Sequence, residues 1–251
     1  MEMKDVHVLI VAGSDSSGGA GIVRDIETVT AHGLKSCVAI TAVTMQTHRA
    51  VKAIEPVAAE LVGAQMLAAL ESNPVAAIKI GMLGTGETLA AVAGILRRHP
   101  NVPVVLDPVL AASSGGGLLD ASAIERLRSE LFPLCTLITP NLPELARLTQ
   151  RPLAQSAAEG MEAGSVLLAS GVQAVLIKGG HATGDEAADI LIRNAMPARI
   201  FTAPRVAGTM RGTGCMMASA IASQLAAGET LEASVELAKD YVSWQFTLNA
   251  R

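Results

Sequence analysis

The tetrapeptide Gly212-Thr213-Gly214-Cys215 points most directly to chemistry, because it opens an apolar stretch at residues 216–225 that predicts a helix. Small residues at a helix start leave backbone N–H groups free, and with the helix dipole these groups bind anions. A thiol in this turn is expected to have a lowered pKa, so Cys215 could act as a base or hydrogen-bond a substrate hydroxyl. We predict an anion site with a catalytic thiol. The alternative is that Cys215 is only a small residue suited to a helix start.

A second run of small residues, Gly13-Ser14-Asp15-Ser16-Ser17-Gly18-Gly19-Ala20-Gly21, follows the first apolar stretch. It does not fit a dinucleotide-binding fingerprint, because Arg24 occupies the third glycine position, and the chain contains no Walker A sequence. The run predicts a turn that brings backbone close to a ligand, with Asp15 able to accept hydrogen bonds. The alternative is a tight turn in which Asp15 caps the following helix.

Two side chains that follow the next predicted strands could contact an organic ring. The amide of Gln46 offers one acceptor and two donors, which match the edge of an aminopyrimidine ring, and Met82 could supply an adaptable apolar wall. A solvated loop for Gln46 and a place in the core for Met82 are the alternatives. Aromatic residues make up only 2% of the chain, so a planar ligand would lie mostly against aliphatic or methionine side chains.

Polar residues that suit phosphate and metal chemistry follow three further strands. A carboxylate such as Asp107 is costly at a strand end unless it is paired, hydrated or metal-bound, so we consider it a direct or indirect Mg²⁺ ligand. Asn141 and Glu144 share one side of a first helical turn, where they could hold Mg²⁺ waters and phosphate oxygens. A capping box uses the same spacing. Lys178, in Lys178-Gly179-Gly180-His181, could reach a transferring phosphoryl group as a point charge.

These residues follow short, nearly continuous runs of Val, Ile, Leu and Ala, which are typical of strands covered by helices on both faces. The runs span residues 7–12, 36–44, 77–82, 102–109, 134–139 and 174–179. Helical patterns lie between them at residues 22–29, 60–70, 87–97 and 121–131. Repeated strand–helix units predict an α/β fold with a parallel sheet, in which ligands bind beyond the carboxyl ends of the strands.

The rest of the chain predicts a hairpin and two closing helices. Residues 189–193 and 199–203 are expected to pair late in the sheet, and residues 214–227 and 231–246 to form helices. The sequence shows no linker, repeat or low-complexity stretch. We therefore expect a single domain over residues 1–251.

The overall composition argues against several classes of protein. Hydrophobic residues make up 50% and charged residues 17% of the chain, so a large core can be buried. The net charge of -4, without a Lys/Arg-rich run, argues against nucleic acid as a partner. No apolar segment approaches the ~20 residues of a membrane span, and the first apolar run is too short for a secretory signal. Three widely spaced cysteines suit a reducing cytosol, so we expect a cytoplasmic protein.

The motifs that follow the strands together resemble those of the ribokinase-like superfamily, and within it the hydroxymethylpyrimidine/phosphomethylpyrimidine kinases. The resemblance covers nearly the whole chain, and the combination of motifs is more specific than any one of them. The matching stretches are Ala12-Gly13-Ser14-Asp15-Ser16-Ser17-Gly18-Gly19-Ala20-Gly21-Ile22, Lys79-Ile80-Gly81-Met82-Leu83, Val105-Leu106-Asp107-Pro108-Val109, Leu137-Ile138-Thr139-Pro140-Asn141-Leu142-Pro143-Glu144, Lys178-Gly179-Gly180-His181 and Gly212-Thr213-Gly214-Cys215.

The resemblance implies a three-layer α/β/α fold with a mostly parallel central sheet. It also implies an ATP- and Mg²⁺-dependent kinase, usually a homodimer, that phosphorylates 4-amino-5-hydroxymethyl-2-methylpyrimidine and then its monophosphate in thiamine biosynthesis. On the substrate side, Gln46 would read the pyrimidine edge and Met82 and Val109 would flank the ring. Gly13 and Asp15 would lie beside it.

On the phosphate side, the resemblance implies that Gly212, Thr213 and Gly214 form an anion hole for the transferring phosphate. Cys215 would occupy the position where sugar kinases of the superfamily carry a catalytic Asp. The phosphates and the metal would be served by Lys178, Asn141 and Glu144, with Asp107 nearby.

The chain departs from the usual pattern of this family around the expected pocket mouth. Thr47 and His48 stand where Asn-Thr usually follows the glutamine, and Arg211 stands where a His usually precedes Gly-Thr-Gly-Cys. These changes bear on the substrate more than on the fold. Two alternatives stay open: a pyridoxal kinase or another divergent kinase of the superfamily, and a non-catalytic pyrimidine-binding or sensing protein that keeps the pocket.

Overall fold

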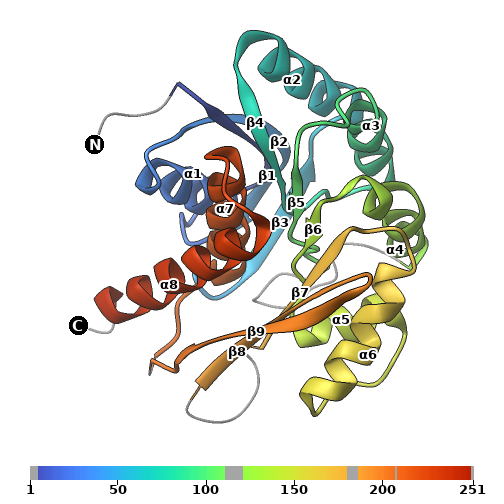
Figure 1. The fold of residues 1–251 in the computed structure, drawn as a ribbon. Coiled ribbons are helices and arrows are strands. Elements are labelled where there is room, and N and C mark those ends of the chain that lie inside the picture. The colour runs from blue at the N-terminus through green and yellow to red at the C-terminus, as the bar shows by residue number, and fades with distance from the viewer. Residues whose placement is uncertain (1–4, 111–120, 180–185, 207, 250–251) are drawn as a thin grey trace.

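The computed structural model describes residues 5–110, 121–179, 186–206 and 208–249. Within them, nine strands form one sheet in the order β3-β2-β1-β4-β5-β6-β7-β8-β9 (Figure 1). The strands are β1 His7–Asp15, β2 Lys35–Gln46, β3 Val51–Pro56, β4 Val75–Ile80, β5 Val104–Leu106, β6 Leu137–Ile138, β7 Ala174–Lys178, β8 Glu186–Arg193 and β9 Met196–Pro204. The helices are α1 Gly21–Ala31, α2 Ala59–Ser72, α3 Gly86–Leu96, α4 Ala121–Arg126, α5 Leu142–Thr149, α6 Ala157–Leu168, α7 Thr213–Ala226 and α8 Leu231–Asn249.

The central strands β2, β1, β4, β5, β6 and β7 are parallel, whereas β3, β8 and β9 pair antiparallel. Side chains of β1 alternate between two apolar layers. Val8 and Ile10 pack in the layer formed by α1, α7 and α8, and Leu9 and Val11 pack in the layer that includes α2, α3, α5 and α6. A strand buried on both faces must be apolar at nearly every position, which explains its continuous apolar run. The predicted three-layer α/β/α fold is confirmed (Figure 1).

The six predicted strands and the late hairpin are present, but several ends differ. β5 and β6 are shorter than predicted at both ends. Pro108 and Pro140, which lack the N–H that a strand ladder needs, lie just beyond their carboxyl ends, and a 3-10 turn at Phe132–Leu134 precedes β6. The edge strand β3 was not predicted from the sequence, because its side chains are exposed or half-buried and show no apolar run. The helix predicted at residues 121–131 is α-helical only as far as Arg126, and a π-helical turn at Leu127–Leu131 continues it.

The strands β1 and β2 extend beyond their neighbours at the carboxyl edge of the sheet. Between the pairs Ala12–Ile40 and Ser14–Val43, β2 has two residues opposite Gly13 alone, which marks a bulge in β2, and the pairing continues to Asp15 opposite Thr44. Bulges bend a strand and redirect its side chains. The extension thereby carries Asp15 and Gln46 past the ends of the other parallel strands, toward the start of α7.

Over the described ranges, no helix is long and apolar enough to cross a membrane. Gly180 and His181, which belong to the motif that follows β7, lie outside the described residues.

A buried ion pair fastens β4 to the two helices that begin at the site. Lys79 Nζ lies 2.7 Å from Asp25 Oδ2, and Ser219 Oγ donates to Asp25 Oδ1 at 2.7 Å. The side chains of Lys79 and Asp25 are both fully buried. Because Asp25 belongs to α1 and Ser219 to α7, the pair fixes how these helices approach the sheet.

Lys79→Met should destabilise the fold by about 3–5 kcal/mol, because the substitution leaves the carboxylate of Asp25 buried without its cation. Urea unfolding followed by circular dichroism measures this loss. The double variant Lys79→Met/Asp25→Leu removes both charges, so it should be more stable than Lys79→Met alone. A double variant that is less stable than the single one would contradict this account of the ion pair.

Candidate active site

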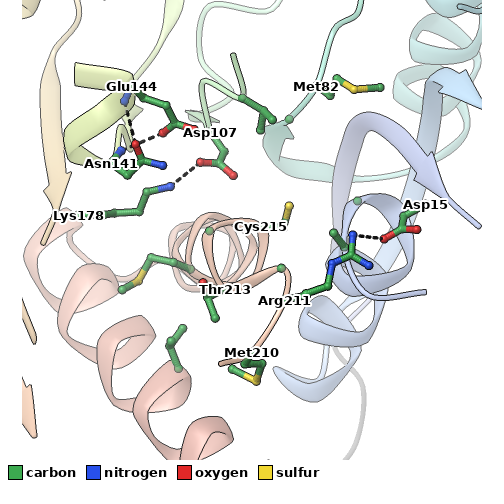
Figure 2. A pocket seen from close by; sticks show the side chains of 18 of the residues that line it. Asp15, Met82, Asp107, Asn141, Glu144, Lys178, Met210, Arg211, Thr213 and Cys215 are labelled. Atoms are coloured by element: carbon green, nitrogen blue, oxygen red, sulfur yellow. Dashed lines mark hydrogen bonds and ion pairs between the residues drawn. The ribbon is translucent and has the colours of Figure 1, made fainter. Parts of the chain in front are cut away.

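A cavity of about 1030 Å³ opens at the carboxyl edge of the sheet. It lies between the extension of β1 and β2 and the starts of α5 and α7 (Figure 2). Every residue that the sequence analysis proposed for the site lines this cavity. These residues are Gly13, Asp15, Gln46, Met82, Asp107, Val109, Asn141, Glu144, Lys178, Gly212, Thr213, Gly214 and Cys215. Their convergence is observed, and their individual roles remain predictions.

The start of α7 has the form expected of an anion site. Gly212 has a φ of 72°, a left-handed conformation that favours glycine, and the helix begins at Thr213. Within the described structure no side chain caps this end, and the N–H of Met216 donates to the carbonyl oxygen of Gly212 at 2.8 Å. The N–H groups of the first turn therefore have no partner inside the helix and are available to a ligand.

An ion pair between Lys178 and Asp107 stands directly against this helix start. Lys178 Nζ lies 2.7 Å from Asp107 Oδ1 (Figure 2). The same oxygen accepts a hydrogen bond from Thr139 Oγ1 at 3.3 Å. A Cβ at Gly214 would lie 3.1 Å from Lys178 Nζ and 3.3 Å from Asp107 Oδ2. Only glycine therefore leaves free space between the amides and the charged pair. Although burial opposes its charge, the carboxylates of Asp107 and Glu144 raise the pKa of Lys178, so it is a cation at neutral pH.

Asn141 and Glu144 form the capping box that the sequence analysis gave as the alternative to a ligand site. The N–H of Asn141 donates to Glu144 Oε2, and the N–H of Glu144 donates to Asn141 Oδ1, both at 2.8 Å. Both residues nevertheless line the cavity. Burial raises the pKa of Glu144 to about 7; Lys178 opposes this shift and the carboxylate of Asp107 adds to it. Because this pKa is close to neutral pH, a cation bound beside Glu144 would favour its ionised form.

The prediction of a lowered pKa for Cys215 is wrong. Burial raises the pKa of its thiol to about 11, and the carboxylates of Asp25 and Asp107 act in the same direction. Lys79 and a hydrogen bond with the backbone of Gly21 oppose the shift without cancelling it. A helix dipole is worth about 0.3–1 kcal/mol in its usual setting, which is less than the cost of burying a thiolate here. The thiol is therefore protonated at neutral pH in the protein alone.

The opposite wall of the cavity is an aliphatic slot that suits a flat ring. Gly13 packs against Met82, because a Cβ at position 13 would lie 2.5 Å from Met82 Cε. Thr41 Oγ1 donates to the carbonyl oxygen of Met82 at 2.6 Å and holds this segment in place. Val109 is half-buried, and its N–H donates to the carbonyl oxygen of Asp107 at 2.8 Å.

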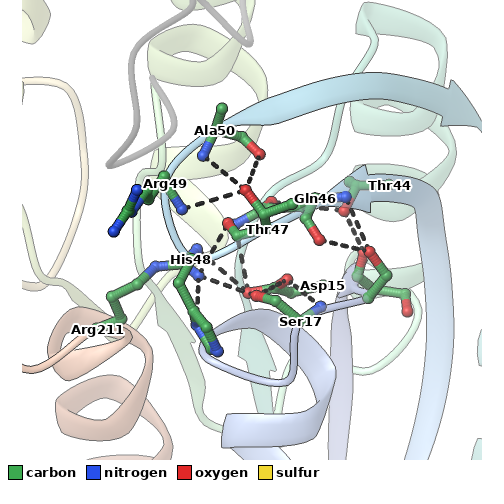
Figure 3. A network of polar contacts seen from close by, with 11 residues as sticks. Asp15, Ser17, Thr44, Gln46, Thr47, His48, Arg49, Ala50 and Arg211 are labelled. Atoms are coloured by element: carbon green, nitrogen blue, oxygen red, sulfur yellow. Dashed lines mark hydrogen bonds and ion pairs between the residues drawn. The ribbon is translucent and has the colours of Figure 1, made fainter.

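Asp15 and Gln46 form the polar edge of this slot. The alternative in which Asp15 caps α1 is wrong, because Asp15 Oδ1 accepts hydrogen bonds from the N–H and Oγ of Ser17 at 2.8 and 2.7 Å. Ala20 is the N-cap residue of α1 and receives no cap from any described side chain. Gln46 Nε2 donates to Asp15 Oδ2 at 3.3 Å (Figure 3).

Several charged residues of the cavity received no role from the sequence. Lys239 Nζ lies 2.7 Å from Asp189 Oδ2, and the N–H of Gly179 donates to Asp189 Oδ1 at 2.9 Å. This pair lines the side formed by β8 and α8, far along the sheet from β1 and β2. Lys79 and Arg211 also line the cavity. The signal for Lys79 and Asp189 was a single charge inside an apolar run, which is costly to bury without a partner.

The carboxylates of the site do not form a closed metal cage. Within the described ranges, no group of three or more His, Cys, Asp or Glu side chains is placed to hold a metal ion. Mg²⁺ commonly keeps several waters and binds through one or two carboxylates together with substrate phosphates. Asp107 and Glu144 on one cavity wall fit that second kind of site.

The comparisons with known proteins agree with this geometry. The model of the phosphomethylpyrimidine kinase family matches residues 15–249. The chain belongs to the phosphomethylpyrimidine kinase family. A hydroxymethylpyrimidine/phosphomethylpyrimidine kinase of Rhizobium meliloti is 43% identical over 234 residues, covering 93% of this chain and 88% of the relative. One from Escherichia coli is 40% identical over 242 residues, covering 96% and 91%.

Solved structures place the fold among kinases of the ribokinase-like superfamily. A phosphomethylpyrimidine kinase from Clostridium difficile superposes with a TM-score of 0.82 at 34% identity, covering 96% of this chain and 99% of that one. A pyridoxal kinase from Staphylococcus aureus, in complex with AMP-PCP and pyridoxal, superposes with a TM-score of 0.85 at 28% identity, covering 94% and 86%. The resemblance inferred from the motifs is thereby confirmed, and the chain is a kinase.

Proposed function

We propose that the protein uses ATP to phosphorylate 4-amino-5-hydroxymethyl-2-methylpyrimidine, its monophosphate, or both, in thiamine biosynthesis. One observation carries this proposal: the uncapped start of α7 faces the Lys178–Asp107 pair on one side and the aliphatic slot on the other. A ring held in the slot would present its hydroxymethyl group to an anion held by the helix start. The family of the chain supports the same reaction.

The substrate would be held by shape and by one polar edge. The side chains of Met82 and Val109 would lie on the two faces of the ring, with the backbone of Gly13 beside it. The amide of Gln46 would donate to and accept from the ring edge, which suits the alternating donors and acceptors of an aminopyrimidine. Asp15, whose oxygens are occupied by protein donors, would act through Gln46.

The nucleotide would occupy the remaining length of the cavity, toward β8 and α8. A volume of about 1030 Å³ lies at the upper end of the usual range for ligand pockets, which leaves room for a nucleotide beside a small ring. Lys178 and the amides of Gly212, Thr213 and Gly214 would contact the transferring phosphate. Asn141, Glu144 and Asp107 would hold Mg²⁺ and its waters. Bound Mg²⁺ would supply positive charge that neutralises the phosphates.

The proposed reaction is an in-line phosphoryl transfer. The hydroxymethyl oxygen forms a bond to the γ-phosphorus of ATP while the bond from that phosphorus to the bridging oxygen breaks. ADP leaves with that electron pair, and the hydroxyl proton passes to the sulfur of Cys215 in its thiolate form. Because the pKa of this thiol is about 11, the thiolate is scarce at neutral pH but is a strong base.

A pyridoxal kinase is the second candidate. Its support is the close superposition of the pyridoxal kinase from Staphylococcus aureus, with a TM-score of 0.85. Pyridoxal also carries a hydroxymethyl group on a flat ring, so the same slot and helix start could serve it. A non-catalytic sensor would keep the slot and bind a pyrimidine without turnover.

We also propose three properties of the whole chain: one domain, a cytoplasmic location and a homodimer. Exposed apolar side chains on β2 and α2 support the homodimer, namely Val43, Met45 and Leu61, which are 53%, 57% and 56% exposed. Apolar surface of this kind is common at contacts between subunits.

Coupled assays of ATP consumption with the hydroxymethylpyrimidine, its monophosphate and pyridoxal test the proposed function. We expect turnover with one or both pyrimidines and a lower kcat/KM with pyridoxal. Turnover of pyridoxal alone would establish the second candidate. Binding of a pyrimidine without turnover of any of the three would establish the sensor.

Cys215→Ala should lower kcat by a factor on the order of 10²–10⁴ while the KM for the pyrimidine changes little, as expected for the loss of a base. In the unmodified protein kcat should rise between pH 7 and pH 9, because the thiolate fraction grows toward the pKa of about 11. The variant should lack this rise. An unchanged kcat in Cys215→Ala would remove the thiol from the mechanism.

A further inference from the structure

Arg211 lies at the junction of three segments that surround the ring slot. Its Nη2 is 3.3 Å from Asp15 Oδ2, and its Nη1 donates to Ser17 Oγ at 2.9 Å. The same Nη1 lies 3.3 Å from the carbonyl oxygen of Thr47 and from Nδ1 of His48. Figure 3 shows the guanidinium between these groups. The residue after Arg211 is Gly212, where the anion site begins.

The carboxylate of Asp15 is nearly enclosed, with 5% of the residue exposed. Oδ1 is satisfied by Ser17, and Oδ2 faces Arg211 and Gln46. An enclosed carboxylate is stable only with a cation or several donors, and the guanidinium is the cation that it has in the described structure. Removing the charge of Arg211 would leave Oδ2 with the Gln46 amide alone.

The contact between Asp15 and Gln46 decides which way the Gln46 amide faces. An ionised carboxylate only accepts hydrogen bonds, so the nitrogen of the amide must face Asp15. The amide oxygen is thereby turned toward the other side, where Thr44 Oγ1 lies 3.5 Å away. One N–H and one oxygen lone pair then remain for a ligand in a fixed order along the slot.

We propose that Arg211 is a positioning residue, which holds Asp15 so that the amide of Gln46 presents one donor and one acceptor to the ring edge in a single orientation. This inference rests on the proposed function, in which Gln46 reads the pyrimidine edge. Specificity for the ring would then depend on Arg211, which directly precedes the N-cap residue of α7. The side chain of Arg211 is therefore one of the contacts that link the ring slot to the anion site.

A double-variant cycle separates this role from a merely structural one. We expect Arg211→Met to raise the Kd of the pyrimidine by about tenfold, since an interaction with a charged partner is lost, while kcat and the KM for ATP change less than about threefold. In a Gln46→Ala background the same substitution should change the Kd less than about threefold, because the residue acts through Gln46. Equal effects in both backgrounds would overturn the proposal.

Two further variants are controls for the loss of positive charge. Arg49→Met removes a positive charge from the turn between β2 and β3, which Arg211 contacts at Thr47 and His48. Arg49 donates its backbone N–H to Thr47 Oγ1 at 3.2 Å, and its side chain points away from Asp15 (Figure 3). Arg49→Met should leave the Kd unchanged, and a loss equal to that of Arg211→Met would overturn the proposal. Arg211→Lys keeps the charge with fewer donors, so its Kd for the pyrimidine should lie between that of the unmodified protein and that of Arg211→Met. If Arg211→Met fails to fold, Arg211→Lys takes its place, and a Kd equal to that of the unmodified protein would then overturn the proposal.

The side-chain amide signal of Gln46 in NMR spectra tests the proposal without any substrate. It is identified by its loss in Gln46→Ala. In the unmodified protein we expect slow exchange of these amide protons with water, and in Arg211→Met faster exchange and a shifted signal. Unchanged amide signals in Arg211→Met and Arg211→Lys would overturn the proposal. If the unmodified protein turns over neither pyrimidine, the proposed function fails, whereas the amide signal still decides the role of Arg211.

Discussion

The site depends on a contact that only glycine permits. A side chain at Gly212 would run into the carbonyl oxygen of Gly19, so the start of α7 lies against the segment between β1 and α1 with no side chain between them. Two residues on, a Cβ at Gly214 would fill the space beside Lys178 and Asp107. The backbone amides of one helix start are thus brought to both the ring slot and the charged pair. The cavity could not join these two parts if that helix began with larger residues.

The charges around this helix start are arranged as pairs. Asp15 with Arg211, Lys79 with Asp25, Lys178 with Asp107 and Lys239 with Asp189 each join a carboxylate to a cation, and at least one member of each pair lines the cavity. Pairing makes burial of these groups tolerable. It also leaves little net positive charge near Cys215, which explains why burial dominates and the pKa of the thiol rises. Charge neutralisation for a polyphosphate must then come largely from Lys178, the helix amides and bound cations.

The strands were largely predictable, because each buried parallel strand appears in the sequence as a continuous apolar run. The helices were less so: α6 was not predicted, and α1, α2 and α7 begin without a side-chain cap. Edge strand β3 was not predictable in this way, since its half-exposed side chains follow no run. The residues predicted for the site line one cavity, because residues at the carboxyl ends of parallel strands converge, and their roles stay predictions. Their electrostatics were not predictable: the pKa of Cys215 depends on burial and on Asp25, Asp107 and Lys79, which come from distant segments. The partners of Arg211 are likewise long-range, with Asp15 lying 196 positions away in the chain.

The central claim is that the open space beside Gly214 is where the phosphoryl group is transferred. Gly214→Ala tests it most directly, with Gly94→Ala in α3 as the matched control, because a Cβ at Gly94 meets no described atom within 4 Å. Steady-state turnover of ATP with the hydroxymethylpyrimidine is the measurement. We expect kcat to fall by roughly 10²–10³ in Gly214→Ala, because the added methyl group would fill the space between the helix amides and the Lys178–Asp107 pair and keep the phosphoryl group from these donors. Gly94→Ala should keep full activity. Turnover of Gly214→Ala within about threefold of the control would contradict the account.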